Sequence, residues 1–537
     1  MARALFKAQL RLFPAAARLI AGFTTVVATV ATIDHAWYSA GLVLVGAVSV
    51  IRLPQRRRVL ECGAALALLA GLVPALFWPA IGGLIASLLL LFISPEQRTE
   101  PMSGLDRLFI SVDYAGFMDV HLWFDPDEPI DVLAVRSAVN DLLNDVPLAR
   151  SFVRQSFWSA ERFSPRVGAF DDTDVVTEHT GPTKEACEAI FNSAMAIDRR
   201  PPFAFDIFSA QDNHRLMLTV HHSFVDGVGA LYLLDLFAQR YDLARGIAPS
   251  TPLALPPRAR RLREFFADRP ISWKVALVKK ALGNRLAPDT RYAAIHDHKG
   301  ADMGTAKLIH VNIDEERYAL YQTRARKYAC STNTFIIACA LVAGTRWRRE
   351  NKLANEPTRT LVAADIRTQL GLGRSLQNWV SQIPVAIPES AIEVPDMISV
   401  INGGLAAAKD GEAMDHSLRL AVNAAVLPTG MARGIFAKRE MDEQTHNLTL
   451  AATTIRWDPS GPLGTSSFGI DQLDAIGPVS RIPGVVLFSS GTRKSLSLHV
   501  GYRDGVLSDH GATRFTELFE AQLALECTPG EESEEQL

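Results

Sequence analysis

Two adjacent histidines, followed by an aspartate and a glycine, are the residues of this sequence best suited to acid–base chemistry. They are His221, His222, Asp226 and Gly227, in the stretch LMLTVHHSFVDGVG. A neutral imidazole titrates near physiological pH and can take a proton from a hydroxyl or an amine. Side chains of neighbouring residues at a strand end point to opposite sides. We therefore expect one ring to face a cavity as a general base and the other to be held inward. We expect Asp226 to hold the turn through a buried ion pair, beside Gly227.

A strand and a helix must position these residues. Leu216, Leu218 and Val220 alternate as in a short strand, and ALYLLDLFAQRY after Gly229 has the apolar spacing of a buried helix. The polar residues thus lie on a strand-to-helix turn, where a rigid scaffold presents side chains to a ligand. Two other interpretations of a histidine pair stay open, namely hydrogen-bonded loop histidines and a metal site. Metal ligands must converge, whereas neighbouring strand residues diverge, so we predict no metal.

The full pattern His-His-x-x-x-Asp-Gly, from His221 to Gly227, resembles the signature of the acyl-CoA-dependent acyltransferase superfamily. That superfamily includes chloramphenicol acetyltransferase, peptide-synthetase condensation domains and wax ester synthase/diacylglycerol acyltransferases. The resemblance covers about residues 101–525. It implies an α/β (α+β) fold with two lobes in a chloramphenicol-acetyltransferase-like sandwich and a tunnel between them. It also implies His222 as the general base, a structural Asp226, and acyl-CoA as a co-substrate with no cofactor.

Two further segments resemble this superfamily near its reaction centre. Ser103 and Asp106 in MSGLDRLFI match the Ser-x-x-Asp-x-x-Phe opening of wax ester synthases and precede an apolar, strand-like run. The same Ser-x-x-Asp is equally a capping box before a helix. Arg367 ends an expected strand, LVAADIR, and resembles the arginine that pairs with the motif aspartate. We predict an Arg367–Asp226 pair, with a surface position for Arg367 as the alternative.

Three other residues are candidates for substrate binding. Asn378 lies in LQNWVSQIPVAIP, which is similar to the Gly-Asn segment of wax ester synthases, although Gln377 stands where the glycine would be. Ser489 and Ser490 lie at an expected strand end and could polarise a carbonyl oxygen; an ordinary turn is the other interpretation.

Composition excludes several classes of protein. The chain has 537 residues and a formal net charge of −3, which gives no reason to expect a nucleic-acid partner. Its five cysteines are scattered without paired spacing. That pattern argues against a disulfide framework and against a cysteine zinc site, and it fits a reducing compartment.

The first 98 residues are predicted to be an all-α membrane region of about four helices. Four apolar runs are nearly free of charge, namely Ala17–Ile33, Trp37–Ile51, Val59–Phe77 and Ala80–Ile93. Several are shorter than the roughly 20 residues that span a bilayer, so we expect two helical hairpins. A buried helical bundle is the alternative. Basic residues cluster before the first run and between the second and third, which predicts a multi-pass protein of the cell (inner) membrane with a cytoplasmic catalytic domain.

The rest of the chain is expected to divide into four parts: residues 99–255 (first lobe), 256–300 (basic connector), 301–525 (second lobe) and 526–537 (acidic tail). The connector mixes basic and aromatic residues. It can lie on anionic headgroups, bind the phosphates of coenzyme A, or be a solvated linker.

These features predict a membrane-anchored O- or N-acyltransferase. It would move an acyl group from a thioester, with acyl-CoA as the expected donor, to the hydroxyl or amine of a lipid-like acceptor. Two alternatives are a condensation-type enzyme that uses chains bound to an acyl carrier protein, and a non-catalytic lipid-binding protein of the same fold.

Overall fold

The structure is a computed structural model. It describes residues 98–113, 118–156, 160–165, 167–180, 183–210, 213–248, 272, 292–297, 304–353, 356–367, 371–407, 429–434, 449–479 and 484–527. The predicted membrane runs, nearly all of the basic connector and all but the first two residues of the acidic tail lie outside the described residues. Among the described helices, none is by itself long and apolar enough to cross a bilayer, whereas two consecutive helices bent by 93°, Glu315–Lys327 and Thr332–Glu350, would together qualify by length and composition.

The chain divides into two compact units. One comprises Met1–Glu100, Arg154–Arg166 and Pro428–Met431, and the other comprises Pro101–Val153, Val167–Leu427 and Ala432–Leu537. The first unit holds β4 (Ala160–Ser164), the central strand of a small sheet with order β1-β4-β3, whose outer strands are β1 (Arg98–Pro101) and β3 (Phe152–Gln155). Everything described below belongs to the second unit.

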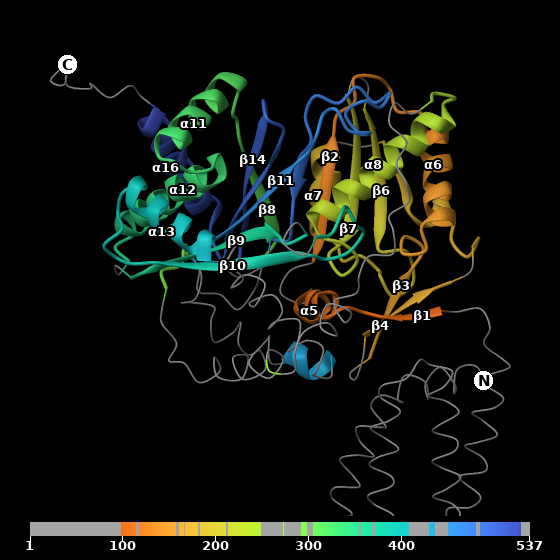
Figure 1. The fold of residues 1–537 in the computed structure, drawn as a ribbon, viewed down its shortest axis with the longest axis horizontal. Coiled ribbons are helices and arrows are strands. Elements are labelled where there is room, and N and C mark those ends of the chain that lie inside the picture. Colours follow the sequence, from red (N-terminus) through yellow and green to blue (C-terminus); the bar gives the residue numbers. More distant parts are fainter. Residues whose placement is uncertain are drawn as a thin grey trace, which may run out of the picture. The chain divides into compact units, whose positions relative to one another are not determined.

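One layer of the second unit is a five-stranded sheet with order β12-β2-β7-β6-β5. Its strands are β12 (Asp474–Ile476), β2 (Asp119–Phe124), β7 (Asn213–His221), β6 (Phe203–Ala210) and β5 (Val176–His179). The helices α6 (Val132–Asp145) and α8 (Gly227–Ala244) pack with it around one apolar core (Figure 1). The short elements η3 (Asp172–Asp174) and α7 (Thr183–Phe191) connect its strands. The edge strand β12 comes from the second half of the chain, so this sheet combines both halves.

The other layer is a six-stranded sheet with order β10-β9-β11-β13-β14-β8. Its strands are β10 (Val380–Ile387), β9 (Thr358–Asp365), β11 (Leu450–Arg456), β13 (Val485–Gly491), β14 (Leu496–Arg503) and β8 (Ala306–Val311). Four helices lie beside it in Figure 1 and share its core: α11 (Glu315–Lys327), α12 (Thr332–Glu350), α13 (Val394–Ala407) and α16 (Asp509–Cys527). The buried apolar side of α12 supplies much of this core.

Most expected elements of the described part are confirmed, and one open alternative is decided. The strands before His221, the helix after Asp226 and the apolar helix from Thr332 are present where the patterns predict them. The run after Ser103 is strand-like in composition, but the capping-box alternative holds, because the run forms helix α5 (Gly104–Val112). Ser103 and Asp106 exchange hydrogen bonds of 3.0 Å with each other's backbone N–H. This capping box satisfies N-terminal amides and outweighs the β tendency of LFI.

Candidate active site

The histidine motif lies on the predicted turn between β7 and α8. His221 is the last residue of β7, and Asp226 caps α8, its Oδ1 accepting a hydrogen bond of 2.9 Å from Gly229 N. Side-chain oxygens suit this position because the first amides of a helix lack partners within the helix. The two neighbouring rings differ as expected: His221 is buried, whereas His222 keeps part of its surface exposed.

The carboxylate of Asp226 is fully hydrogen-bonded. Arg367 donates from Nη2 to Oδ1 (2.9 Å) and from Nη1 to Oδ2 (3.0 Å), and Trp379 N donates to Oδ2 (2.6 Å). The predicted ion pair is therefore present, in a bidentate form, with Asp226 2% and Arg367 3% exposed. Burial disfavours the charge of Arg367, but Asp226 and Asp365 more than offset it and raise the pKa of the guanidinium. The pair ties the start of α8 to the end of β9.

Asn378 fixes the protonation pattern of the His222 ring. Its Nδ2 donates to Asp106 Oδ1 (2.8 Å) and to the backbone oxygen of His222 (2.7 Å). Its Oδ1 then faces His222 Nδ1 at 3.1 Å, where it can only accept. Nδ1 of His222 must therefore carry the proton, and the free lone pair lies on Nε2. A general base needs this tautomer if Nε2 is to receive the proton.

Helix α5 completes the surroundings of His222. The Phe109 ring stacks on the imidazole, with centroids 3.8 Å apart and an interplanar angle of 15°. Burial lowers the pKa of His222 below its usual 6.5, against the charge of Asp226 and the bond to Asn378, which raise it. The ring is thus neutral at pH 7. The Ser-x-x-Asp-x-x-Phe segment forms a capping box and also delivers Asp106 and Phe109 to the site.

His221 belongs to a separate, acidic environment. Its Nε2 lies 3.4 Å from Asp113 Oδ1, and its Nδ1 lies 2.7 Å from the Ser223 hydroxyl. Burial lowers the pKa of His221, but the bond to Asp113 and the charges of Asp119 and Asp113 outweigh it and raise the pKa. Burial also raises the pKa of Asp119 to about 6. His221 is buried among these groups, whereas the partly exposed His222 ring can meet a substrate, so His222 is the better placed of the two for proton transfer.

The remaining predicted site residues are Gly227, Ser489 and Ser490. Gly227 packs against Ile455, and a Cβ at this glycine would come within 2.7 Å of Ile455 Cδ1. The Ser489 hydroxyl lies 2.8 Å from Thr454 Oγ1, and Ser490 Oγ is buried without a hydrogen-bond partner. Within the part of the chain that the structure describes, neither serine has a hydrogen bond to His222. Their predicted contact with a substrate carbonyl stays a prediction.

Sequence reasoning missed several members of the site. Asp113 and Asp119 lie in no motif, and only the register of β2 with β7, which sets Asp119 opposite His221, brings this carboxylate to the ring. The hydrogen bond from Asn378 to Asp106 joins two segments that each resemble the superfamily, but no sequence pattern links one segment to the other. The implied tunnel is untested: His222 lines neither of two cavities among the described residues, one of which is lined in part by Asp119 while the other lies at the start of α12.

Sequence comparison finds no relative: no family model matches this chain, and no curated protein matches it. Solved structures do match. An epimerization domain from the third module of tyrocidine synthetase B has a TM-score of 0.58 at 14% identity, covering 80% of this chain and 96% of that one. The first condensation domain of the CDA synthetase has the same TM-score and identity, with 80% and 97% covered. Polyketide synthase associated protein 5 from Mycobacterium tuberculosis has a TM-score of 0.57 at 14% identity, with 80% and 98% covered. The described part of this chain therefore has a mixed α/β fold similar to that of condensation domains.

Proposed function

We propose that this chain is a condensation-type acyltransferase with His222 as its general base. The observation that carries the proposal is the Asp106–Asn378–His222 chain of hydrogen bonds, which leaves a neutral, partly exposed imidazole with its lone pair on Nε2. A ring held in one tautomer by Asn378, which Asp106 orients in turn, is pre-organised for proton transfer. The Asp226–Arg367 pair holds the turn that carries this ring and has no part in the chemistry.

The reaction follows from that tautomer. Nε2 removes the proton of an acceptor hydroxyl or amine while the acceptor oxygen or nitrogen attacks the thioester carbonyl carbon. The tetrahedral intermediate then collapses, its C–S bond breaks, and the imidazolium returns the proton to the leaving thiolate. No acyl-enzyme is needed. General-base catalysis of this kind contributes about 10²–10⁴-fold to a rate.

The substrates follow from the chain's other features. Four apolar runs precede the described region, and they support anchoring in the inner membrane with the catalytic part on the cytoplasmic side. An anchored enzyme reaches acceptors in the adjoining leaflet, so we propose a lipid-like alcohol or amine. The donor is a thioester, with acyl-CoA as our first choice.

A carrier-bound thioester is the second candidate donor. The likeness to the condensation domain of the CDA synthetase favours it. The two donors separate in a transfer assay that supplies either acyl-CoA or an acylated carrier protein at equal concentration. Release of thiol from only one of them assigns the donor.

Comparative mass spectrometry of membrane lipids tests the function itself. Cells that express the full chain should contain acylated lipids that are absent from cells expressing His222→Ala. The matched control is His510→Ala, which removes an exposed histidine of α16. If His222→Ala and the unmodified chain give the same lipids, or if neither changes them, the catalytic proposal fails and a lipid-binding role for the fold takes its place.

A further inference from the structure

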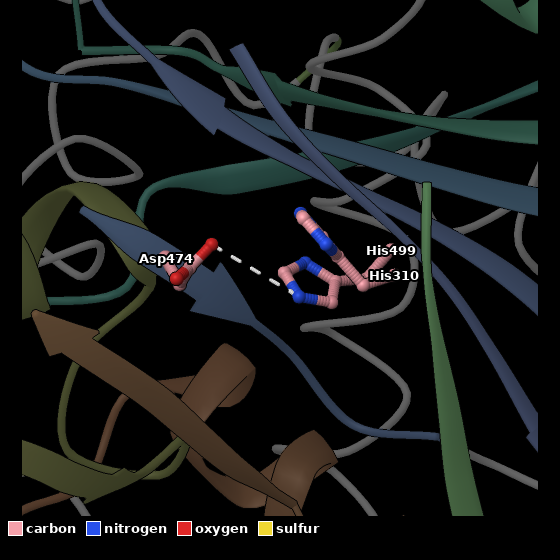
Figure 2. A group of neighbouring side chains, drawn as sticks. All are labelled: His310, Asp474 and His499. Atoms are coloured by element: carbon pink, nitrogen blue, oxygen red, sulfur yellow. Dashed lines mark ion pairs between the residues drawn. The ribbon is translucent and has the colours of Figure 1, made fainter. Parts of the chain in front are cut away.

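Three potential metal ligands converge between the two sheets, separately from the residues that contact His222. They are His310 on β8, Asp474 on β12 and His499 on β14, and their ligand atoms all lie within 4.8 Å of one another. His499 Nε2 and Asp474 Oδ1 are 4.0 Å apart, as marked by the dashed line in Figure 2. This separation is too long for a hydrogen bond. The carboxylate and the imidazole thus face each other at ion-pair distance without a hydrogen bond between them.

Strand register places these residues together. His310 and His499 are directly opposite each other in the antiparallel β8–β14 pair, and their ring centroids are 4.9 Å apart. Asp474 comes from the edge strand of the other sheet, where it is the register partner of Trp123. The Ser497 hydroxyl donates a hydrogen bond to Asp474 and so orients the carboxylate. Such outer hydrogen bonds are typical around metal-binding carboxylates.

Among the described residues, one ring nitrogen of the buried His499 has no hydrogen-bond partner. The residue is 6% exposed, and the unpartnered atom is Nδ1. Buried polar atoms without partners are uncommon and call for an explanation.

The charges around His310, Asp474 and His499 allow a cation to bind there. Arg215 is a positive group whose charge acts on His499, and both its Nε and its Nη2 are bonded to Asp125, at 2.7 and 2.9 Å. Asp474 offers a negative charge directly at the site. The other neighbouring ring, Trp123, meets His499 edge to face at 5.5 Å and carries no charge.

We propose that His310, Asp474 and His499 bind one Zn²⁺ or a similar first-row transition-metal ion. Two imidazole nitrogens and one carboxylate oxygen form a known zinc donor set and leave a coordination position for water. Mg²⁺ and Ca²⁺ prefer all-oxygen sites. Tetrahedral zinc needs its ligand atoms about 3.4 Å apart, so the three side chains must close by roughly 1 Å. His310 is exposed and can rotate to do so.

A bound ion would join the two sheets of the second unit. Asp474 belongs to the five-stranded sheet, whereas both histidines belong to the six-stranded sheet. A ligand that binds only the folded state stabilises it. Zn²⁺ should therefore raise the melting temperature of the protein, independently of any acyl transfer.

Metal titration of the full chain, tag-free and chelator-treated in mild detergent, tests this site. Calorimetry with Zn²⁺ alone and visible spectroscopy with Co²⁺ should show one ion bound through these ligands, and Mg²⁺ should give no signal. His310→Ala and Asp474→Asn should each weaken Zn²⁺ binding at least 100-fold and abolish the rise in melting temperature. His310→Ala replaces an exposed side chain and should leave folding intact.

The control is His510→Ala, an exposed histidine on α16, which should bind Zn²⁺ like the unmodified chain. Two results overturn the proposal. One is the absence of Zn²⁺ binding by the unmodified chain. The other is binding that keeps its stoichiometry and affinity in both His310→Ala and Asp474→Asn.

Discussion

Replacing Arg367 by methionine should destabilise the protein far more than a typical loss of an ion pair. Met keeps most of the buried stem but removes both bonds to the Asp226 carboxylate, which is 2% exposed. It also leaves the backbone oxygen of Gln377 without its 2.6 Å donor. Breaking a buried pair by removing one partner costs about 3–5 kcal/mol because the other charge stays buried. We expect a loss in this range for Arg367→Met.

Urea unfolding of the full chain in detergent, followed by tryptophan fluorescence, measures this loss. Trp379 is a suitable reporter because its backbone N–H donates to Asp226. The double variant Asp226→Asn/Arg367→Met removes both charges, so its loss should be smaller than the sum of the two single losses.

The matched control is Arg317→Met, which breaks an exposed pair with Asp314 on α11. Exposed pairs contribute at most about 1 kcal/mol, so the control should change little. A loss below about 1 kcal/mol for Arg367→Met, or single losses that simply add in the double variant, would refute the reasoning.

Three further predictions concern the site. Asn378→Ala should slow transfer about 10-fold or more, because His222 loses the acceptor that fixes its tautomer; steady-state rates at saturating donor check this. Asp119→Asn should remove a fall in the free energy of unfolding between about pH 4 and pH 6. The Asp119 carboxyl, with its folded pKa raised to about 6, binds its proton more tightly in the folded state, and this stabilisation is lost as the pH rises. Urea midpoints across this pH range measure the effect. Gly227→Ala should cost about 1–3 kcal/mol by forcing Ile455 to move, and the rise in urea sensitivity should be smaller in Gly227→Ala/Ile455→Val.

Residues close together in sequence were predictable, because local structure alone brings them together. The turn from His221 to Gly227 needs only a strand, a cap and a helix, and all three are readable from periodicity and from the side-chain oxygen of Asp226. The Arg367 contact was predictable only through resemblance to a family, since no local pattern connects it to the turn.

Contacts that depend on strand register were not predictable from the sequence. Asp119 meets His221 because β2 pairs with β7 in one particular register. His310 meets His499 in the same way, and Asp474 joins them because β12 crosses from one half of the chain to the sheet of the other. A register shift of one residue would turn each side chain to the opposite face, and nothing in a single sequence fixes that register.

The helix α5 shows how a local cap decides between two alternatives. Its LFI run has a β tendency, but the Ser103–Asp106 capping box decides in favour of helix. That choice carries Phe109 onto the His222 ring. A strand would alternate its side chains and could not present Asp106 and Phe109, three residues apart, on one side.

The pH dependence of acyl transfer by the full chain tests the central claim most directly. Thiol release from acyl-CoA in native membranes should fall about 10²–10⁴-fold in His222→Ala, while His510→Ala stays at the unmodified rate. Because the pKa of His222 is lowered, the rate of the unmodified chain should hold as the pH falls through 6.5 and decline only below it. Transfer by His222→Ala at the unmodified rate, with the same pH profile, would contradict the account.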